Sequence, residues 1–201
     1  NNSPDNAVPI PGALSNAPAN AGTVRDTIRV ETDLLSLEIA QVGGAIVSAR
    51  LLAYPQTPAD PDTKFRLLKP EPPNLFIIES GLRGGESGPL PPDTRSLQFQ
   101  SAETSYRLPE GQEALEVQLT WSDPAGGEIH RLYRFTRGSY VIDLTQRVVN
   151  NTPAPLAARA FSQVIRTELY DPEASRFIYT SPGAVYYTPE AKYHRAPFNK
   201  M

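Results

Sequence analysis

The side chains that most often carry acid–base or metal chemistry are scarce in this sequence. It contains two histidines, His130 and His194, and no cysteine. A zinc site needs three or four ligands at short spacings, and no His-x-x-x-His pair or third ligand accompanies either histidine. We therefore interpret both as ordinary surface residues. The lack of cysteine excludes disulfides, zinc–thiolate sites and thiol catalysis, but it leaves the compartment open.

Nucleophilic and phosphate-binding motifs are also missing. No Gly-x-Ser-x-Gly elbow is present to expose a catalytic serine. The segment 81–92, GLRGGESGPLPP, is rich in glycine, but it has neither the Lys-Ser/Thr of a P-loop nor the fingerprint of a dinucleotide site. We interpret it as a loop. Glycoside hydrolysis needs two carboxyl groups at a defined distance from each other. The sequence contains 22 acidic residues, but it does not show which of them lie at that distance.

Tyrosines offer a different kind of site, since their rings could line a groove that binds sugar or peptide. Aromatic residues are also favoured in strands for packing alone, and this explanation is the better one for the sequence. The residues concerned are Tyr133, Tyr140, Tyr170, Tyr179, Tyr186, Tyr187 and Tyr193. The residues alone thus predict no catalytic, cofactor-binding or metal-binding site.

The elements that would position any site are predicted to be antiparallel strands. In the hairpin 28–54, Leu35, Leu37 and Ile39 alternate with polar or small residues, which is the two-residue period of a strand with one buried face. Gly43-Gly44 supplies the turn, because glycine tolerates positive φ. Pro55 is expected to end the second arm, since it lacks a backbone donor.

The second half of the chain predicts a meander followed by shorter elements. Strands are expected over 115–122, 128–136 and 140–150, and a long strand over 156–167. Shorter strands are expected over 65–68, 75–78, 97–100, 104–107, 177–180 and 184–187. Thr188-Pro189-Glu190 resembles a capped helix start, so a short C-terminal helical turn is predicted through Tyr193. The predicted fold class is all-β, an antiparallel β-sandwich.

Composition limits the possible environments and partners. The chain has 201 residues, a formal charge of −3 and 21 prolines, and no apolar run reaches the ~18 residues of a membrane span. Scattered cations and an acidic balance argue against nucleic acid. Residues 1–24, rich in Asn, Ala and Pro, predict a disordered tether, and residues 25–201 a sandwich domain. The segment is expected to be a soluble, extracytoplasmic piece of a longer protein.

Short motifs follow one another from Ile28 to the last residues, and their order and spacing matter more than any one of them. They are Val30–Leu34, Gly43-Gly44, Leu52–Pro55, Phe65–Leu68, Ser80–Leu82, Glu110–Gln112, Asp123–Gly126, Arg137–Tyr140, Val148–Asn150, Pro155-Leu156 and Tyr187–Tyr193. Together they resemble the large periplasmic domain of the YidC family of membrane-protein insertases of Gram-negative bacteria.

This resemblance implies a β-supersandwich similar to that of galactose mutarotases, on the periplasmic face of the inner membrane. It implies a non-enzymatic interaction domain without cofactors, in a multi-pass protein that inserts and folds membrane proteins with or without the Sec translocon. The implied partners are Sec accessory subunits and nascent membrane proteins. The family domain normally continues past the Tyr-Thr-Pro-Glu stretch, so this piece is expected to lack part of its sandwich and to leave an edge exposed.

An exported sugar-binding or epimerase-like sandwich is the alternative. It rests on the tyrosines and on the fold analogy, which is a weak warrant for function. Epimerase-type proton transfer needs a histidine acid and a carboxylate base that converge on a sugar ring. The sequence gives no sign of such a pair, and it assigns no residue to a binding site.

Overall fold

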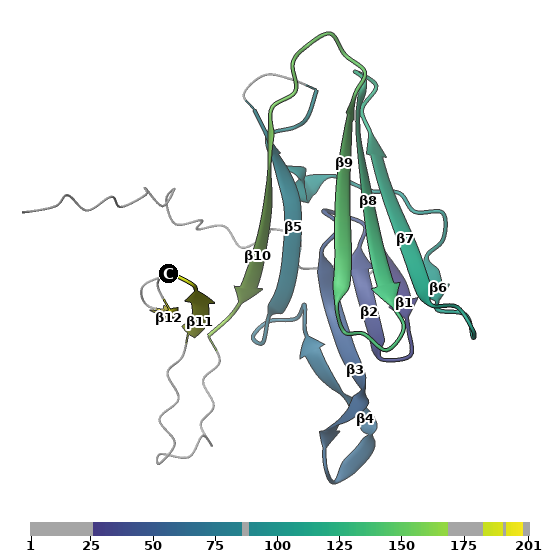
Figure 1. The fold of residues 1–201 in the computed structure, drawn as a ribbon, viewed down its shortest axis with the longest axis vertical. Helices are drawn as coiled ribbons and strands as arrows, with labels where there is room; N and C mark the ends of the chain where they lie inside the picture. The colour runs from purple at the N-terminus through teal and green to yellow at the C-terminus, as the bar shows by residue number, and fades with distance from the viewer. Residues whose placement is uncertain (1–25, 86–88, 169–182, 191, 199–201) are drawn as a thin grey trace, which may run out of the picture. The chain divides into compact units, whose positions relative to one another are not determined.

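The computed structural model describes residues 26–85, 89–168, 183–190 and 192–198 (Figure 1). The chain divides into two compact units, one spanning Thr23–Thr167 and one that includes Glu168–Met201. The first unit contains two β-sheets and the second a single hairpin. The predicted tether 1–24 and the predicted strand 177–180 lie outside the described residues.

The larger sheet of the first unit has seven strands. Its order is β10-β5-β3-β2-β1-β6, with β4 paired to β3. All described pairs in it are antiparallel except β1–β6. The strands are β1 (Thr27–Glu31), β2 (Leu35–Ala40), β3 (Ile46–Thr57), β4 (Asp60–Leu68), β5 (Phe76–Gly84), β6 (Ser105–Arg107) and β10 (Ala158–Arg166).

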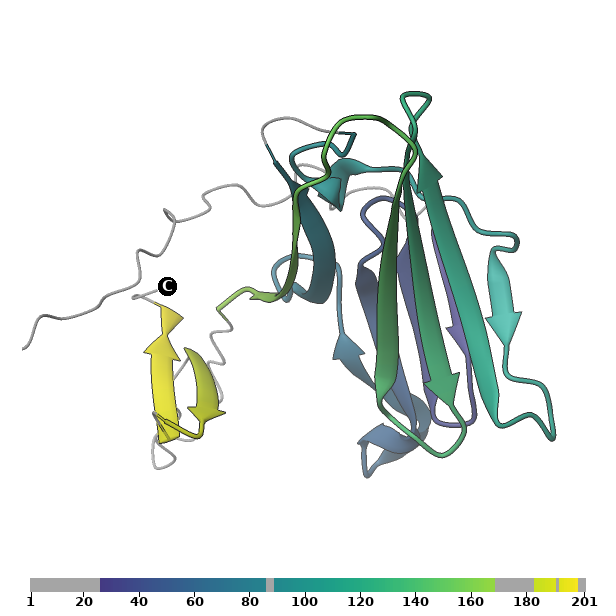
Figure 2. The same cartoon turned by 45° about the horizontal axis from the view of Figure 1, so that its top comes forward.

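The smaller sheet is the predicted meander. It joins β7 (Ala114–Ser122), β8 (Gly127–Thr136) and β9 (Ile142–Asn150) in sequence order. In both views the meander lies over β1 and β2, and β5 and β10 lie to one side of it (Figure 2). A short 3-10 helix, η1 (Thr94–Ser96), follows β5. The all-β antiparallel sandwich predicted from the sequence is confirmed, whereas its specific likeness to galactose mutarotases stays a prediction.

Alternating apolar residues from the two sheets make one core. The larger sheet contributes Ile28, Val30, Leu35, Leu37 and Ile39, and the smaller contributes Val117, Leu119, Ile129, Tyr133 and Phe135. Each of these side chains is at most 4% exposed. Burial on this scale supplies the main favourable free energy of the fold.

One transverse row of the larger sheet shows where this cover ends. Ile28 pairs with Ile39, Ile39 with Ile46, Ile46 with Ile78, and Ile78 with Val164. The exposed fraction along this row rises from 0% at Ile28 and Ile39 to 9%, 37% and then 63% at Val164. Within the described residues, the apolar row therefore extends past the side chains that bury it.

The second unit contradicts the predicted C-terminal helical turn. Residues Gly183–Thr188 form β11 and Lys192–Pro197 form β12, paired from Gly183↔Pro197 to Thr188↔Lys192. Tyr187 packs edge-on against Tyr193 with ring centroids 5.2 Å apart. The Thr-Pro-Glu cap signal is thus overridden by cross-strand aromatic pairing, and Lys192 takes a φ of 59° at the turn.

Two further predictions are corrected. Pro55 does not end the second arm of the hairpin, because β3 continues to Thr57 with register shifts on either side of Pro55. A β-bulge allows a proline, which has no backbone N–H to donate, within an edge region of a sheet. The expected strand 97–100 is reduced to isolated bridges, Val42↔Gln98 and Gln100↔Thr120. The predicted strand 65–68 is present but longer than expected, because β4 covers Asp60–Leu68.

A buried arginine joins the two sheets at the Gly43-Gly44 turn. Arg131 of β8 is 0% exposed, and its guanidinium donates to the carbonyl of Gly43 and, over 3.3 Å, to Thr94 Oγ1. Its Cζ lies 4.5 Å from the ring centroid of Phe99, which is a cation–π contact. Tyr133 donates to the carbonyl of Gly44. The turn predicted from local sequence is therefore held by side chains from the opposite sheet.

We expect Gly44→Ala to destabilise the protein much more than Gly138→Ala. Both glycines have left-handed φ, 65° and 71°, so each variant pays about 1–2 kcal/mol for the backbone. A Cβ on Gly44 would also lie 2.5 Å from Nη1 of Arg131, whereas a Cβ on Gly138 meets nothing within 4 Å. The predicted extra loss for Gly44→Ala is about 2 kcal/mol.

Urea unfolding followed by the fluorescence of Trp121, the one tryptophan of the chain, measures both losses. Equal losses for the two variants would show that the arginine contact adds nothing to the turn.

Candidate functional site

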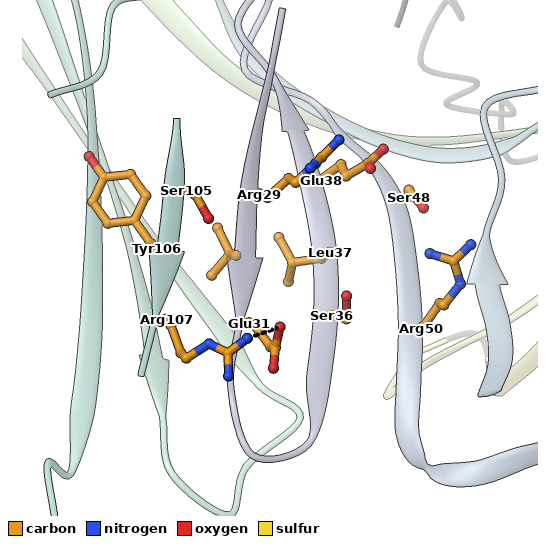
Figure 3. Close-up of a pocket in the computed structure, with 11 residues that line it drawn as sticks. Arg29, Glu31, Ser36, Leu37, Glu38, Ser48, Arg50, Ser105, Tyr106 and Arg107 are labelled. Carbon is orange, nitrogen blue, oxygen red and sulfur yellow. Dashed lines mark hydrogen bonds and ion pairs between the residues drawn. The ribbon is translucent and has the colours of Figure 1, made fainter. Parts of the chain in front are cut away.

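The outer face of the larger sheet, opposite the core, carries a polar depression of about 250 Å³ (Figure 3). It crosses four neighbouring strands, β6, β1, β2 and β3. The side chains that line it are mostly charged or hydroxylated. They are Arg29, Glu31, Ser36, Glu38, Ser48, Arg50, Ser105, Tyr106 and Arg107, with Val30 and Leu37 beneath.

Strand register arranges these side chains in two rows. Arg107, Glu31, Ser36 and Arg50 are successive cross-strand partners, and Ser105, Arg29, Glu38 and Ser48 form the neighbouring row. They occupy the positions that alternate with the buried Val30, Leu35, Leu37 and Ala49. The same period that buries the core therefore presents this polar face.

Charges in the depression are only partly paired. Arg107 donates to Glu31 across 3.0 Å, and both side chains are largely exposed. Arg29 and Arg50 are exposed, and no carboxylate lies within 4.0 Å of either among the described residues. Such a face can bind polar or anionic groups through guanidinium and hydroxyl donors. It contains no histidine or cysteine for nucleophilic catalysis.

A second charged cluster lies around η1. Arg95 donates to Asp93 at 2.6 Å and lies 3.9 Å from Glu79, whose carboxylate also accepts from Gln163 at 2.7 Å. Partial burial acts to raise the pKa of Asp93, but hydrogen bonds from Arg95 outweigh it and hold the pKa below its ordinary value. A general acid needs the opposite shift, so Asp93 is unsuited to the general-acid role in glycoside hydrolysis.

The histidines singled out in the sequence lie in different units of the chain. His130 contacts Glu128 over 3.1 Å on β8, with about a third of its side chain exposed. His194 of β12 stacks on Tyr186 at 5.4 Å between ring centroids. No group of three His, Asp or Glu side chains in the described part of the chain could hold a metal ion.

The tyrosines singled out in the sequence are divided between the two units. Tyr133 is buried against the Gly44 carbonyl, whereas Tyr140 is exposed beside Tyr54, with ring centroids 6.2 Å apart. Tyr186, Tyr187 and Tyr193 belong to the separate β11–β12 unit, and Tyr170 and Tyr179 lie outside the described residues. Within the unit Thr23–Thr167, Tyr133 and Tyr140 therefore do not share a groove, since one is buried and the other exposed.

Comparison with known families decides the broader assignment. The family model described as "YidC periplasmic domain" matches residues 27–201. The chain belongs to the YidC periplasmic domain family. This membership confirms the resemblance predicted from the ordered motifs, and it is consistent with a place on the periplasmic side of the inner membrane.

Relatives named "Membrane protein insertase YidC" agree with the family match. The protein of Nitrosococcus oceani is 34% identical over 98% of this chain and 35% of its own length. That of Methylococcus capsulatus is 38% identical over 92% of this chain and 33% of its own length. That of Alkalilimnicola ehrlichii is 36% identical over 87% of this chain and 30% of its own length. This chain thus spans about a third of the YidC proteins it matches.

Within its described residues, the chain offers no α-helix of the length and apolarity needed to cross a bilayer. The polar depression was not found from the sequence. Alternation in the first hairpin could have placed Arg29, Glu38 and Arg50 on one face, because they fall between the apolar positions. Arg107 could not have been added, since β6 joins β1 from 76 residues away in sequence.

We expect the Asp93–Arg95 pair to make stability depend on pH in the acid range. The folded pKa of Asp93 lies below its unfolded value of about 3.9, so the pair stabilises the fold above that pH. This contribution is lost as the pH falls from about 4 through the folded pKa. Asp93→Asn should therefore lose at most about 1 kcal/mol at pH 7, since the pair is partly exposed, and less at pH 3.

Urea unfolding at the two pH values checks this expectation, with Arg95→Gln as the matched control that removes the other partner. An Asp93→Asn loss that stays constant with pH would show that the carboxylate charge is not what Arg95 stabilises.

Proposed function

We propose that this chain is a non-enzymatic interaction domain of an inner-membrane protein insertase. The observation that carries the proposal is the family match over 27–201, which includes both sheets and the β11–β12 hairpin. The parent protein would insert and fold membrane proteins, alone or beside the Sec translocon. Nascent membrane proteins and Sec accessory subunits are the proposed partners of this domain.

The geometry of the described residues supports an interaction role over catalysis. The Glu31–Arg107 and Asp93–Arg95 ion pairs include no histidine. The polar depression presents donors and acceptors across four strands, which suits contact with a polypeptide surface. The sugar-binding alternative is not favoured by the family match.

We also propose that residues 1–24 tether residues 25–201 to the membrane-embedded part of the parent. The first 24 residues contain no aromatic side chain and one acidic side chain, Asp5. Such a segment cannot bury enough apolar surface to offset the entropy of ordering it.

Site-specific photo-crosslinking in the full-length parent tests the interaction role. A photoreactive amino acid at Ser36, in the depression, should crosslink to nascent membrane proteins or Sec accessory subunits in inner-membrane vesicles. The same probe at Thr145, exposed on β9, is the control. We expect the Ser36 yield to exceed the Thr145 yield several-fold, because only the first probe lies in the proposed contact face.

Equal yields at the two positions would remove the depression from the contact. Calorimetric titration of the chain with monosaccharides provides the opposing test, and saturable tight binding of a sugar would favour the exported sugar-binding alternative.

A further inference from the structure

The outer face of the larger sheet continues past β3 into a second, more basic depression. It has a volume of about 390 Å³ and lies between β3, β4 and the segment 69–74. Four cationic side chains and one carboxylate line it, although the whole chain carries a net charge of −3. The charged residues are Arg50, Lys64, Arg66, Lys69 and Glu71. We name this feature the β3–β4 basic depression.

Several donors in the basic depression have no partner. Arg66 donates from Nη2 to Glu71 at 2.7 Å, but its Nε is buried without a hydrogen bond. Among the described residues, no carboxylate lies within 4.0 Å of Arg50 or Lys69. The hydrogen bond from Arg66 holds the pKa of Glu71 below its ordinary value, so this carboxylate is ionised and already engaged. An anion with several acceptor oxygens would satisfy the remaining donors.

Apolar side chains accompany the cations on the same hairpin. Tyr54 is 53% exposed on β3, and Phe65 and Leu67 are 38% and 40% exposed on β4. In Figure 1 the β3–β4 hairpin projects beyond the end of the meander. Phe65 pairs with Leu51, and Arg66 pairs with Arg50, so Phe65 lies on the other face of the hairpin from the depression. The excess of four cations over one carboxylate is therefore what fits the depression to an anionic surface.

We propose that the β3–β4 basic depression binds the phosphate groups of anionic phospholipids and docks the domain on the membrane surface. The inference rests on the proposed function, which places the domain beside the membrane that holds its parent. Asp60 and Asp62 lie at the hairpin end, so the contact involves the depression, with the acidic end outside it. The net negative remainder of the chain would then favour one orientation over an anionic surface.

Co-sedimentation of the full 201-residue chain with lipid vesicles tests the proposal. Vesicles of equal parts phosphatidylglycerol and phosphatidylcholine should bind the chain, and vesicles of phosphatidylcholine alone should not. Each cation near an anionic surface changes the affinity roughly fivefold, so Arg50→Gln/Lys69→Gln should weaken binding about twenty-five-fold. Glu71→Gln removes the one carboxylate and should strengthen binding. Added salt should weaken the wild-type interaction.

The matched control is Arg147→Gln/Arg159→Gln, which makes the same charge change at exposed positions on β9 and β10. Equal weakening by the two double variants would overturn the proposal, as would equal binding to both kinds of vesicle. Displacement by inorganic phosphate at constant ionic strength would indicate a free phosphate site, and tight binding of polyglutamate without vesicle binding would indicate an acidic protein. Unfolding curves confirm that each variant folds.

This experiment is separate from the crosslinking test of the proposed function. The chain could fail to bind vesicles and still crosslink to nascent proteins from Ser36, which would overturn only the lipid inference. Vesicle binding without crosslinking would contradict the interaction role of the first depression instead.

Discussion

The sandwich depends on a cation buried between its sheets. Arg131 is fully buried, and burial acts to lower the pKa of its guanidinium, yet an arginine stays charged at physiological pH. No carboxylate among the described residues compensates it. The backbone oxygen of Gly43, the hydroxyl oxygen of Thr94 and the face of the Phe99 ring do so instead. Because an unpaired buried charge is costly, these contacts fix the Gly43-Gly44 turn and η1 at the position where the meander can reach them.

The Arg131 contacts hold the meander on one face of the larger sheet. The two faces of that sheet therefore have different roles. The inner face under the meander is dry and apolar, and it becomes exposed along the row from Ile28 to Val164. The outer face is a lattice of arginine, glutamate and serine side chains that runs across β6, β1, β2 and β3 and becomes basic at β4. In a periplasmic domain of the YidC family, the inner face serves folding, and the outer face is the one that the two proposals use.

The two proposals place different demands on this outer face. A polypeptide contact needs donors and acceptors spread over several strands, which the rows through Glu31 and Glu38 provide. A lipid contact needs excess positive charge, which Arg50, Arg66 and Lys69 of the β3–β4 basic depression provide. Arg50 lines both depressions. The two contacts can therefore lie side by side on one surface without sharing most of their residues.

The sequence by itself determined the strands of the first hairpin, the meander and the all-β class, because alternation of apolar and polar residues is a local property. The ordered motifs also determined the family. Tertiary structure decided what local signals could not. Cross-strand pairing turned the Thr188–Tyr193 helix signal into a hairpin, and bulges carried β3 past Pro55. The candidate site needed β6 beside β1, and the Arg131 contact needed two sheets. Each joins residues far apart in sequence, so only the folded chain brings these charges within reach of one another.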